Sequence, residues 1–165
     1  MSETFKFWTH GVSVVPEYTK EYTGTDNGLY LRRTGFGSIV RQNLGTGNWF
    51  HFAIPSATRL DDDASKHYLA WLRFRINTDA VIKQIHVRGN QRNSESPIIW
   101  QSGSISITGQ DTQYDIDLRK QGSGSFAARV SNFSYGPVVI SVNVYFEGAK
   151  GEVLFTGAGV HFEEM

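Results

Sequence analysis

The most informative part of this chain is the stretch Asn48-Trp49-Phe50-His51-Phe52-Ala53-Ile54-Pro55. Phe50, Phe52 and Ile54 recur at every second position, which is the spacing of one face of a β-strand. Trp49 and His51 then fall on the opposite face, and the final proline, which lacks a backbone N–H for a ladder, is expected to end the strand. The stretch therefore predicts a strand with a buried apolar face and an outward face that carries an indole and an imidazole.

Similar strands are predicted along almost the whole chain, because runs of β-branched and aromatic residues alternate with breaks at many of the 17 glycines. The clearest alternation places Val138, Ile140, Val142, Val144 and Phe146 on one face and Ser141, Asn143 and Tyr145 on the other, as in a strand with one buried side. Helix is expected to be nearly absent. The expected strands are Thr4–Trp8, Val12–Val15, Leu29–Arg33, Asn48–Ile54, His67–Asn77, Val81–Arg88, Ile98–Ile107, Thr112–Lys120, Phe126–Asn132, Val138–Phe146 and Glu152–Phe162.

So many short strands do not form one flat open sheet, and the usual solution is two packed sheets or a closed barrel. We expect an all-β fold, a single-domain antiparallel β-sandwich of jelly-roll type that spans residues 1–165. No linker divides the chain and no repeat of solenoid or propeller length is present. A chain of this length buries roughly two-thirds of its unfolded surface, so neither a disulfide nor a structural metal is needed.

The charge balance limits the partners. Lys plus Arg equals Asp plus Glu at 16 each, and the pI is about 7.0, so no global field attracts nucleic acid or an anionic membrane. Ten basic and four acidic residues do fall between Leu29 and Arg92, which makes the middle of the chain locally basic. The sequence shows neither a signal peptide nor an apolar run of membrane-spanning length, which predicts the cytoplasm by default and leaves export without a leader open.

Two blocks of the sequence carry a family resemblance. They are Trp8-Thr9-His10-Gly11-Val12-Ser13-Val14 and, more specifically, the Asn-Trp-Phe-His-Phe-Ala-Ile-Pro block at residues 48–55. Together with the strand at Leu69–Ile76, they make the chain similar to an uncharacterised family of small bacterial proteins known only as a domain of unknown function. The resemblance implies a bacterial origin and a single compact β-domain, and it brings no catalytic residues with it.

The outward faces of three strands in the basic middle of the chain provide candidate binding residues. If the apolar alternation of each strand points inward, three pairs of residues point outward: Trp49 and His51, Trp71 and Arg73, and His86 and Arg88. Consecutive strands are neighbours about two times in three, so the three strands could share one sheet and present these side chains together. Indoles stack on sugar rings, and arginine binds carboxylate, sulfate or phosphate oxygens. The pattern predicts a non-enzymatic, lectin-like module that binds a polar saccharide, neutral or anionic.

Two other interpretations of the same residues stay open. The indoles could lie beneath a loop with arginine stems packed over them, which is the more common arrangement. Alternatively, the protein is a structural or assembly subunit, and the Trp/Arg face is a homo-oligomer interface. The second interpretation is favoured by apolar residues on both faces of Leu69–Ile76 and Val81–Val87, which a partner subunit could cover.

Motifs for metals and catalysis are weak. The run Asp61-Asp62-Asp63 could contribute oxygen ligands to Ca²⁺, but it lacks the frame of an EF-hand loop, and such a run is more often a solvated turn. The five histidines show no zinc-ligand spacing, and no Gly-x-Ser-x-Gly elbow is present. An Arg-and-aromatic face could also bind single-stranded nucleic acid, against which the neutral pI argues. We therefore expect no enzyme, no cofactor and no nucleic-acid partner.

Overall fold

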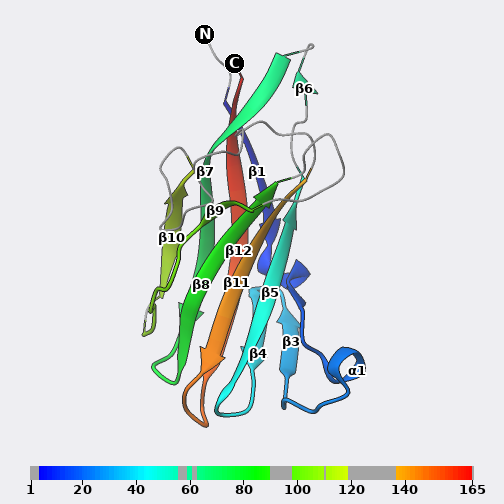
Figure 1. The fold of residues 1–165 in the computed structure, drawn as a ribbon, viewed down its shortest axis with the longest axis vertical. Coiled ribbons are helices and arrows are strands. Elements are labelled where there is room, and N and C mark those ends of the chain that lie inside the picture. Colours follow the sequence, from blue (N-terminus) through cyan, green and yellow to red (C-terminus); the bar gives the residue numbers. More distant parts are fainter. Residues whose placement is uncertain are drawn as a thin grey trace.

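The computed structural model describes residues 4–55, 59–60, 63–89, 98–109, 111–118 and 137–164, and these residues form two β-sheets packed face to face (Figure 1). Sheet A contains β3 (Tyr30–Thr34), β4 (Gly37–Arg41), β12 (Glu152–Glu164), β7 (Asp63–Ile76) and β10 (Asp111–Asp117), with β1 (Thr4–His10) paired to β12 and β6 (Arg59–Leu60) paired to β7. Sheet B contains β2 (Val15–Pro16), β5 (Thr46–Ile54), β11 (Val138–Phe146), β8 (Ala80–Gly89) and β9 (Ile98–Gln101).

The strand order is that of a jelly roll. From β4 to β8 the chain crosses between the sheets three times, with β4 in sheet A, β5 in sheet B, the β6–β7 hairpin in sheet A and β8 in sheet B. The last two strands then insert into the middle of the sandwich: β11 lies between β5 and β8, and β12 between β4 and β7. Every described strand ladder is antiparallel. The predicted antiparallel sandwich of jelly-roll type is therefore confirmed.

The core lies between the two sheets and follows the predicted alternation. Sheet B contributes Phe50, Phe52 and Ile54, all fully buried, and the apolar face of β11 is buried throughout. Sheet A contributes Phe155, whose ring centroid lies 5.3 Å from that of Phe50 and 5.4 Å from that of Phe52. Aromatic rings from opposite sheets thus interlock at the centre of the sandwich.

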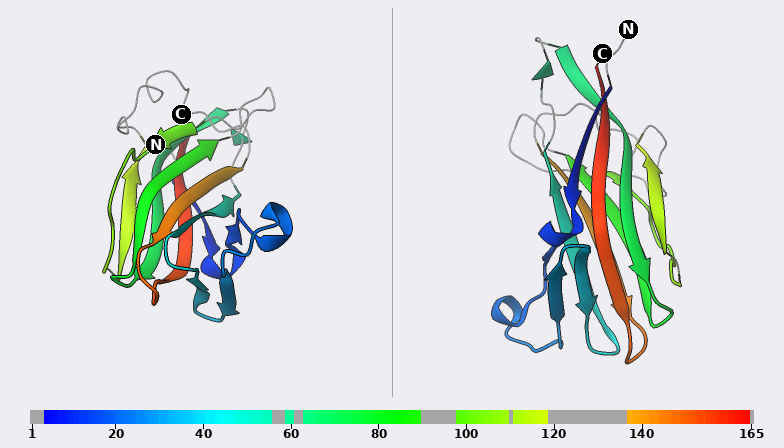
Figure 2. Two further views of the ribbon diagram at one scale, coloured as in Figure 1. Left: turned by 60° about the horizontal axis from the view of Figure 1, so that its bottom comes forward. Right: turned by 180° about the vertical axis from the view of Figure 1, so that it is seen from behind.

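The chain passes from sheet A to sheet B near its N-terminus, between β1 and β2 (Figure 2). β1 ends at His10, a 3₁₀ turn η1 (Gly11–Ser13) follows, and β2 then pairs with the edge of β5. Gly11 packs against the backbone carbonyl of Phe155, where any Cβ would overlap it. The absent side chain lets the crossing stay close to β12, and residues 17 and 18 consequently arrive beside β5.

Several expected elements differ in the structure. Val12 lies in η1, and the neighbouring strand is only Val15–Pro16. Of the expected strand Ile98–Ile107, only β9 and an isolated bridge between Ile82 and Ile107 form. The hairpin strand β4 and the four-residue helix α1 (Lys20–Thr23) had no counterpart in the prediction. The expected strand Phe126–Asn132 lies outside the described residues.

Among the described segments, no helix is long and apolar enough to cross a membrane.

Candidate functional site

The outer face of sheet B brings three polar side chains into one row. In the strand register, His51 of β5 lies opposite Ser141 of β11, and Ser141 lies opposite His86 of β8. Trp49 precedes His51 by two residues and therefore projects from the same face of β5, one row away. Arg88 has the same relation to His86 on β8. Four of the six predicted binding residues thus share one surface.

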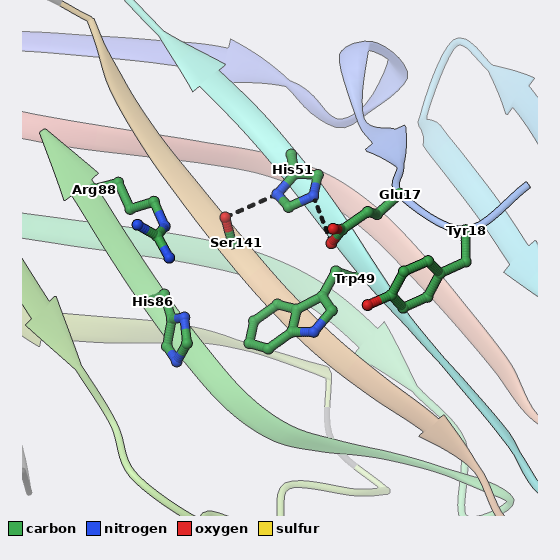
Figure 3. A pocket seen from close by; sticks show the side chains of 7 residues that line it. All are labelled: Glu17, Tyr18, Trp49, His51, His86, Arg88 and Ser141. Atoms are coloured by element: carbon green, nitrogen blue, oxygen red, sulfur yellow. Dashed lines mark hydrogen bonds and ion pairs between the residues drawn. The ribbon is translucent and has the colours of Figure 1, made fainter. Parts of the chain in front are cut away.

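These side chains line a shallow pocket of about 270 Å³ (Figure 3). The pocket is completed by two residues of the segment that follows β2. Its lining residues are Glu17, Tyr18, Trp49, His51, His86, Arg88 and Ser141. Aromatic surface, hydrogen-bond donors and carboxylate oxygens therefore converge on one small volume.

The aromatic wall of the pocket consists of Trp49 and His86. Their ring centroids lie 4.7 Å apart with an interplanar angle of 40°. The indole of Trp49 extends across β11 toward β8, as Figure 3 shows, and covers the outer face of the central strand. The two rings support each other, so the indole is held in place before any ligand arrives.

His51 is held from both sides. Its Nδ1 lies 2.8 Å from Ser141 Oγ, and its Nε2 lies 3.2 Å from Glu17 Oε2. A carboxylate can only accept a hydrogen bond, so in the neutral imidazole Nε2–H donates to Glu17, and the Ser141 hydroxyl donates to Nδ1. The ring therefore has a defined tautomer and orientation.

The order carboxylate, imidazole, hydroxyl is also that of a nucleophilic triad, but the surroundings do not support nucleophilic chemistry. Ser141 is only 4% exposed and lies in the middle of the central strand β11. Because ladders on both sides of β11 engage its backbone, no pair of free N–H groups is available beside Ser141 to stabilise an oxyanion. We interpret this chain of hydrogen bonds as a device that orients His51.

A buried amide fixes the segment that carries Glu17 and Tyr18. Asn48 is fully buried; its Oδ1 accepts from the Tyr18 backbone N–H at 2.8 Å, and its Nδ2 donates to the Tyr18 carbonyl at 2.9 Å. The same Nδ2 donates to Gln42 Oε1 at 2.9 Å, and the Glu17 backbone N–H donates to the Trp49 carbonyl at 2.8 Å. These bonds hold the pocket rim against β5.

The pKa of His86 is lowered, first because burial penalises the charged imidazolium and second because the Arg88 guanidinium lies nearby. His161 on sheet A shows the same direction: burial and the Lys6 ammonium lower its pKa, while Asp115 opposes them. At neutral pH both rings are therefore uncharged. In the pocket, a neutral His86 can offer both a donor and an acceptor to a ligand.

We expect the protein to lose stability in mild acid because of these two histidines. In the unfolded chain the two imidazoles bind protons near the ordinary pKa of 6.5, whereas in the folded chain their pKa values are lower. Their contribution to the free energy of unfolding is therefore complete above pH 6.5 and is lost as the pH falls through the lowered pKa values. Thermal melts at closely spaced pH values between 8 and 5 should show a falling Tm. The double variant His86→Gln/His161→Gln should show a flatter profile than the wild type, and an equal slope in both proteins would contradict this origin.

Trp71 and Arg73 lie elsewhere, so the prediction that all three strands share one sheet is wrong. β7 pairs with β10 and β12 in sheet A, and its outward residues project from the opposite side of the sandwich. The guanidinium carbon of Arg73 lies 5.2 Å from the centroid of the Trp71 ring. The jelly-roll crossing explains the error, since consecutive strands in this topology alternate between the sheets.

Of the three proposed calcium ligands, Asp61, Asp62 and Asp63, only Asp63 lies among the described residues. Asp61 and Asp62 lie outside the described residues, and Asp63 is described only as the first residue of β7. In the described part of the chain, no group of three or more His, Cys, Asp or Glu residues is arranged to hold a metal ion.

Three pocket residues were missed by the sequence reasoning. Ser141 had a usable signal, because the alternation of β11 places it on the outward face. Glu17 and Tyr18 had none, since they reach the pocket through the long-range pairing of β2 with β5 and through the buried Asn48.

No family model and no curated protein matches the chain. Several solved structures resemble it in overall arrangement. The CBM36-1 domain of a multidomain xylanase from the hindgut metagenome of Trinervitermes trinervoides is 10% identical, with a TM-score of 0.43, over 94% of this chain and 96% of that one. A xylan-binding module, CBM15, is 13% identical, with a TM-score of 0.44, over 98% and 95%. TmCBM61, solved with β-1,4-galactotriose, is 13% identical, with a TM-score of 0.40, over 99% and 88%.

Proposed function

We propose that this protein is a non-catalytic binding module that takes a saccharide into the pocket on the outer face of sheet B. The observation that carries the proposal is the convergence of the Trp49–His86 aromatic wall with Arg88, His51 and Glu17 around one volume of about 270 Å³. A sugar offers apolar ring faces and a rim of hydroxyls, and this pocket offers an indole face and fixed polar groups. The pocket geometry, rather than the structural likenesses, supports this assignment.

The charges of the pocket favour an uncharged sugar. Beside the neutral His86 ring, the Glu17 carboxylate and the Arg88 guanidinium contribute opposite charges to the pocket, and Glu17 already faces His51. Hydroxyl groups can both donate to the carboxylate and accept from the guanidinium, whereas an acidic sugar would meet Glu17 as a like charge. We therefore assign a neutral saccharide as the ligand class.

The indole N–H resonances of the four tryptophans provide a direct test. Trp49 reports on the pocket, and Trp100, which is buried in the core, serves as the internal reference. Titration with soluble xylan, β-1,4-galactan, mixed-linkage β-glucan and mannan should shift the Trp49 resonance with at least one of them and leave Trp100 in place. Arg88→Ala should weaken that binding about tenfold or more, as expected for a hydrogen bond to a charged group.

The matched control is Lys83→Ala, which removes a cation from the same strand outside the pocket lining; its ammonium lies 3.3 Å from Glu147 Oε1. This variant should bind as the wild type does. The proposed function would be contradicted if no saccharide shifted the Trp49 resonance. Equal binding by Arg88→Ala and Lys83→Ala would also count against it.

A further inference from the structure

The outer face of sheet A carries a second arrangement of indoles that the pocket does not use. Trp8 of β1 lies opposite Gly159 of β12, Gly159 lies opposite Trp71 of β7, and Trp71 lies opposite Asp115 of β10. The two tryptophans thus occupy one row on the two strands that flank β12, roughly 10 Å apart at their Cα atoms by the usual strand spacing.

Glycine on β12 permits the placement of the Trp71 indole. A Cβ at Gly159 would overlap Cε2, Cζ2 and Nε1 of that indole, and a Cβ at Gly157 would touch its six-membered ring at 3.5 Å. The indole therefore lies against the bare backbone of β12 and extends toward Trp8. Trp8 itself, on β1, which pairs with β12 alone among the described strands, is 64% exposed, a high value for so large an apolar side chain.

Polar side chains form an ordered edge beside the two indoles. Arg73 Nε donates to Gln113 Oε1 at 2.7 Å, and Gln113 Nε2 donates to Asp115 Oδ1 at 2.7 Å. Asp115 lies in the same row as Trp71, and Gln113 lies in the next row, opposite Arg73. This edge alternates donors and acceptors, as a ligand rich in hydroxyls requires.

From this geometry we propose that the outer face of sheet A is a second saccharide-binding surface, which takes an extended, uncharged glycan chain across β1, β12 and β7. Trp8 stacks on a sugar ring of the chain. The Trp71 indole, with the Arg73 guanidinium 5.2 Å from its ring centroid, forms the floor of the path, and Arg73, Gln113 and Asp115 bind the hydroxyls of the chain. Lys6, Arg73 and Arg75 on this face alternate with Asp115 and Asp117, so the surface carries both signs of charge and has no single-sign field to select a nucleic acid or an acidic polymer.

The two surfaces lie on opposite sides of the sandwich, so each can be occupied without the other. A protein with both can bridge two glycan chains, and it gains avidity where both chains belong to one network, so that the two surfaces are engaged at the same time. This second surface stands on its own residues and does not require the sheet B pocket to be functional.

The experiment uses a Trp49→Ala protein and the same four soluble polysaccharides, with the Trp8 and Trp71 indole resonances as reporters. At least one polysaccharide should shift both resonances, and Trp8→Ala/Trp71→Ala should weaken this binding at least tenfold. Gly159→Ala is the sharper variant, because it removes no contacting group and only displaces the Trp71 indole; it should also weaken the binding. The matched control, Gly35→Ala, adds a Cβ in open space and should change nothing.

Two results would overturn the proposal. One is that none of the four polysaccharides shifts the indole resonance of Trp8 or of Trp71. The other is a dimer mass by light scattering that falls to a monomer mass in Trp8→Ala, which would make this face the homo-oligomer interface considered from the sequence. A failure of the sheet B pocket to bind saccharides would be detected separately, as a Trp49 resonance of the wild type that no polysaccharide shifts.

Discussion

Replacing Trp49 with alanine is expected to weaken saccharide binding at the sheet B pocket by about 30-fold or more, equivalent to about 2 kcal/mol. The indole is the largest apolar side chain of the pocket, and it packs against the His86 ring, with the two ring centroids 4.7 Å apart. Alanine removes the stacking face and also frees His86 from its partner. Isothermal titration with the best-binding soluble polysaccharide would measure the loss.

The fold should survive this change, because Trp49 projects from the outer face of β5 and not into the core. An unshifted Trp100 resonance would verify the fold. Phe36→Ala is the matched control: it removes another exposed aromatic side chain, 81% exposed in the turn between β3 and β4 and outside the pocket. Binding by Trp49→Ala within threefold of the wild type would contradict the role assigned to the indole.

The face of each strand could be predicted from the sequence because it depends only on local alternation. Phe50 and Phe52 were expected inside and Trp49 and His51 outside, and the structure places them so. The same holds for β11, whose apolar face is buried over its whole length. A side chain on a strand has two possible directions, and the apolar partners at every second position select one of them.

The pairing of strands could not be predicted in this way. Trp71 and Arg73 were correctly expected to point outward, yet they belong to the other sheet. Local alternation contains no information about which strand lies alongside, and the preference of consecutive strands for each other fails in a jelly roll, where β5, β7 and β8 alternate between sheets. The six candidate residues were therefore predicted on one surface, and they lie on two opposite faces of the sandwich.

Long-range hydrogen bonds account for the rest of the pocket. Glu17 and Tyr18 belong to a segment without a strong pattern, and only the buried Asn48, thirty positions away, fixes it beside β5. Asn48 opens the most informative stretch of the chain, but an asparagine at the start of a strand is also a common turn residue. Its role follows from its burial and its partners, neither of which the sequence displays.

Replacing Phe155 with alanine is expected to destabilise the protein by about 3–5 kcal/mol, since it deletes a fully buried ring and leaves a cavity. The ring joins the two sheets through its contacts with Phe50 and Phe52 across the core. Because a domain of this size has a total stability of about 5–15 kcal/mol, the change removes a large share of it. The Tm should fall by roughly 10 °C.

Chemical denaturation of Phe155→Ala, Phe50→Ala and the double variant would measure both the loss and its origin. If the rings support each other across the sheets, the double variant should lose less than the sum of the two single losses, by about 0.5–1.5 kcal/mol. Phe36→Ala, which removes the same side chain from an exposed turn, should stay within about 0.5 kcal/mol of the wild type. A Phe155→Ala loss of stability below about 1 kcal/mol would contradict the role assigned to this ring. It would mean that the surrounding core closes over the missing side chain at little cost.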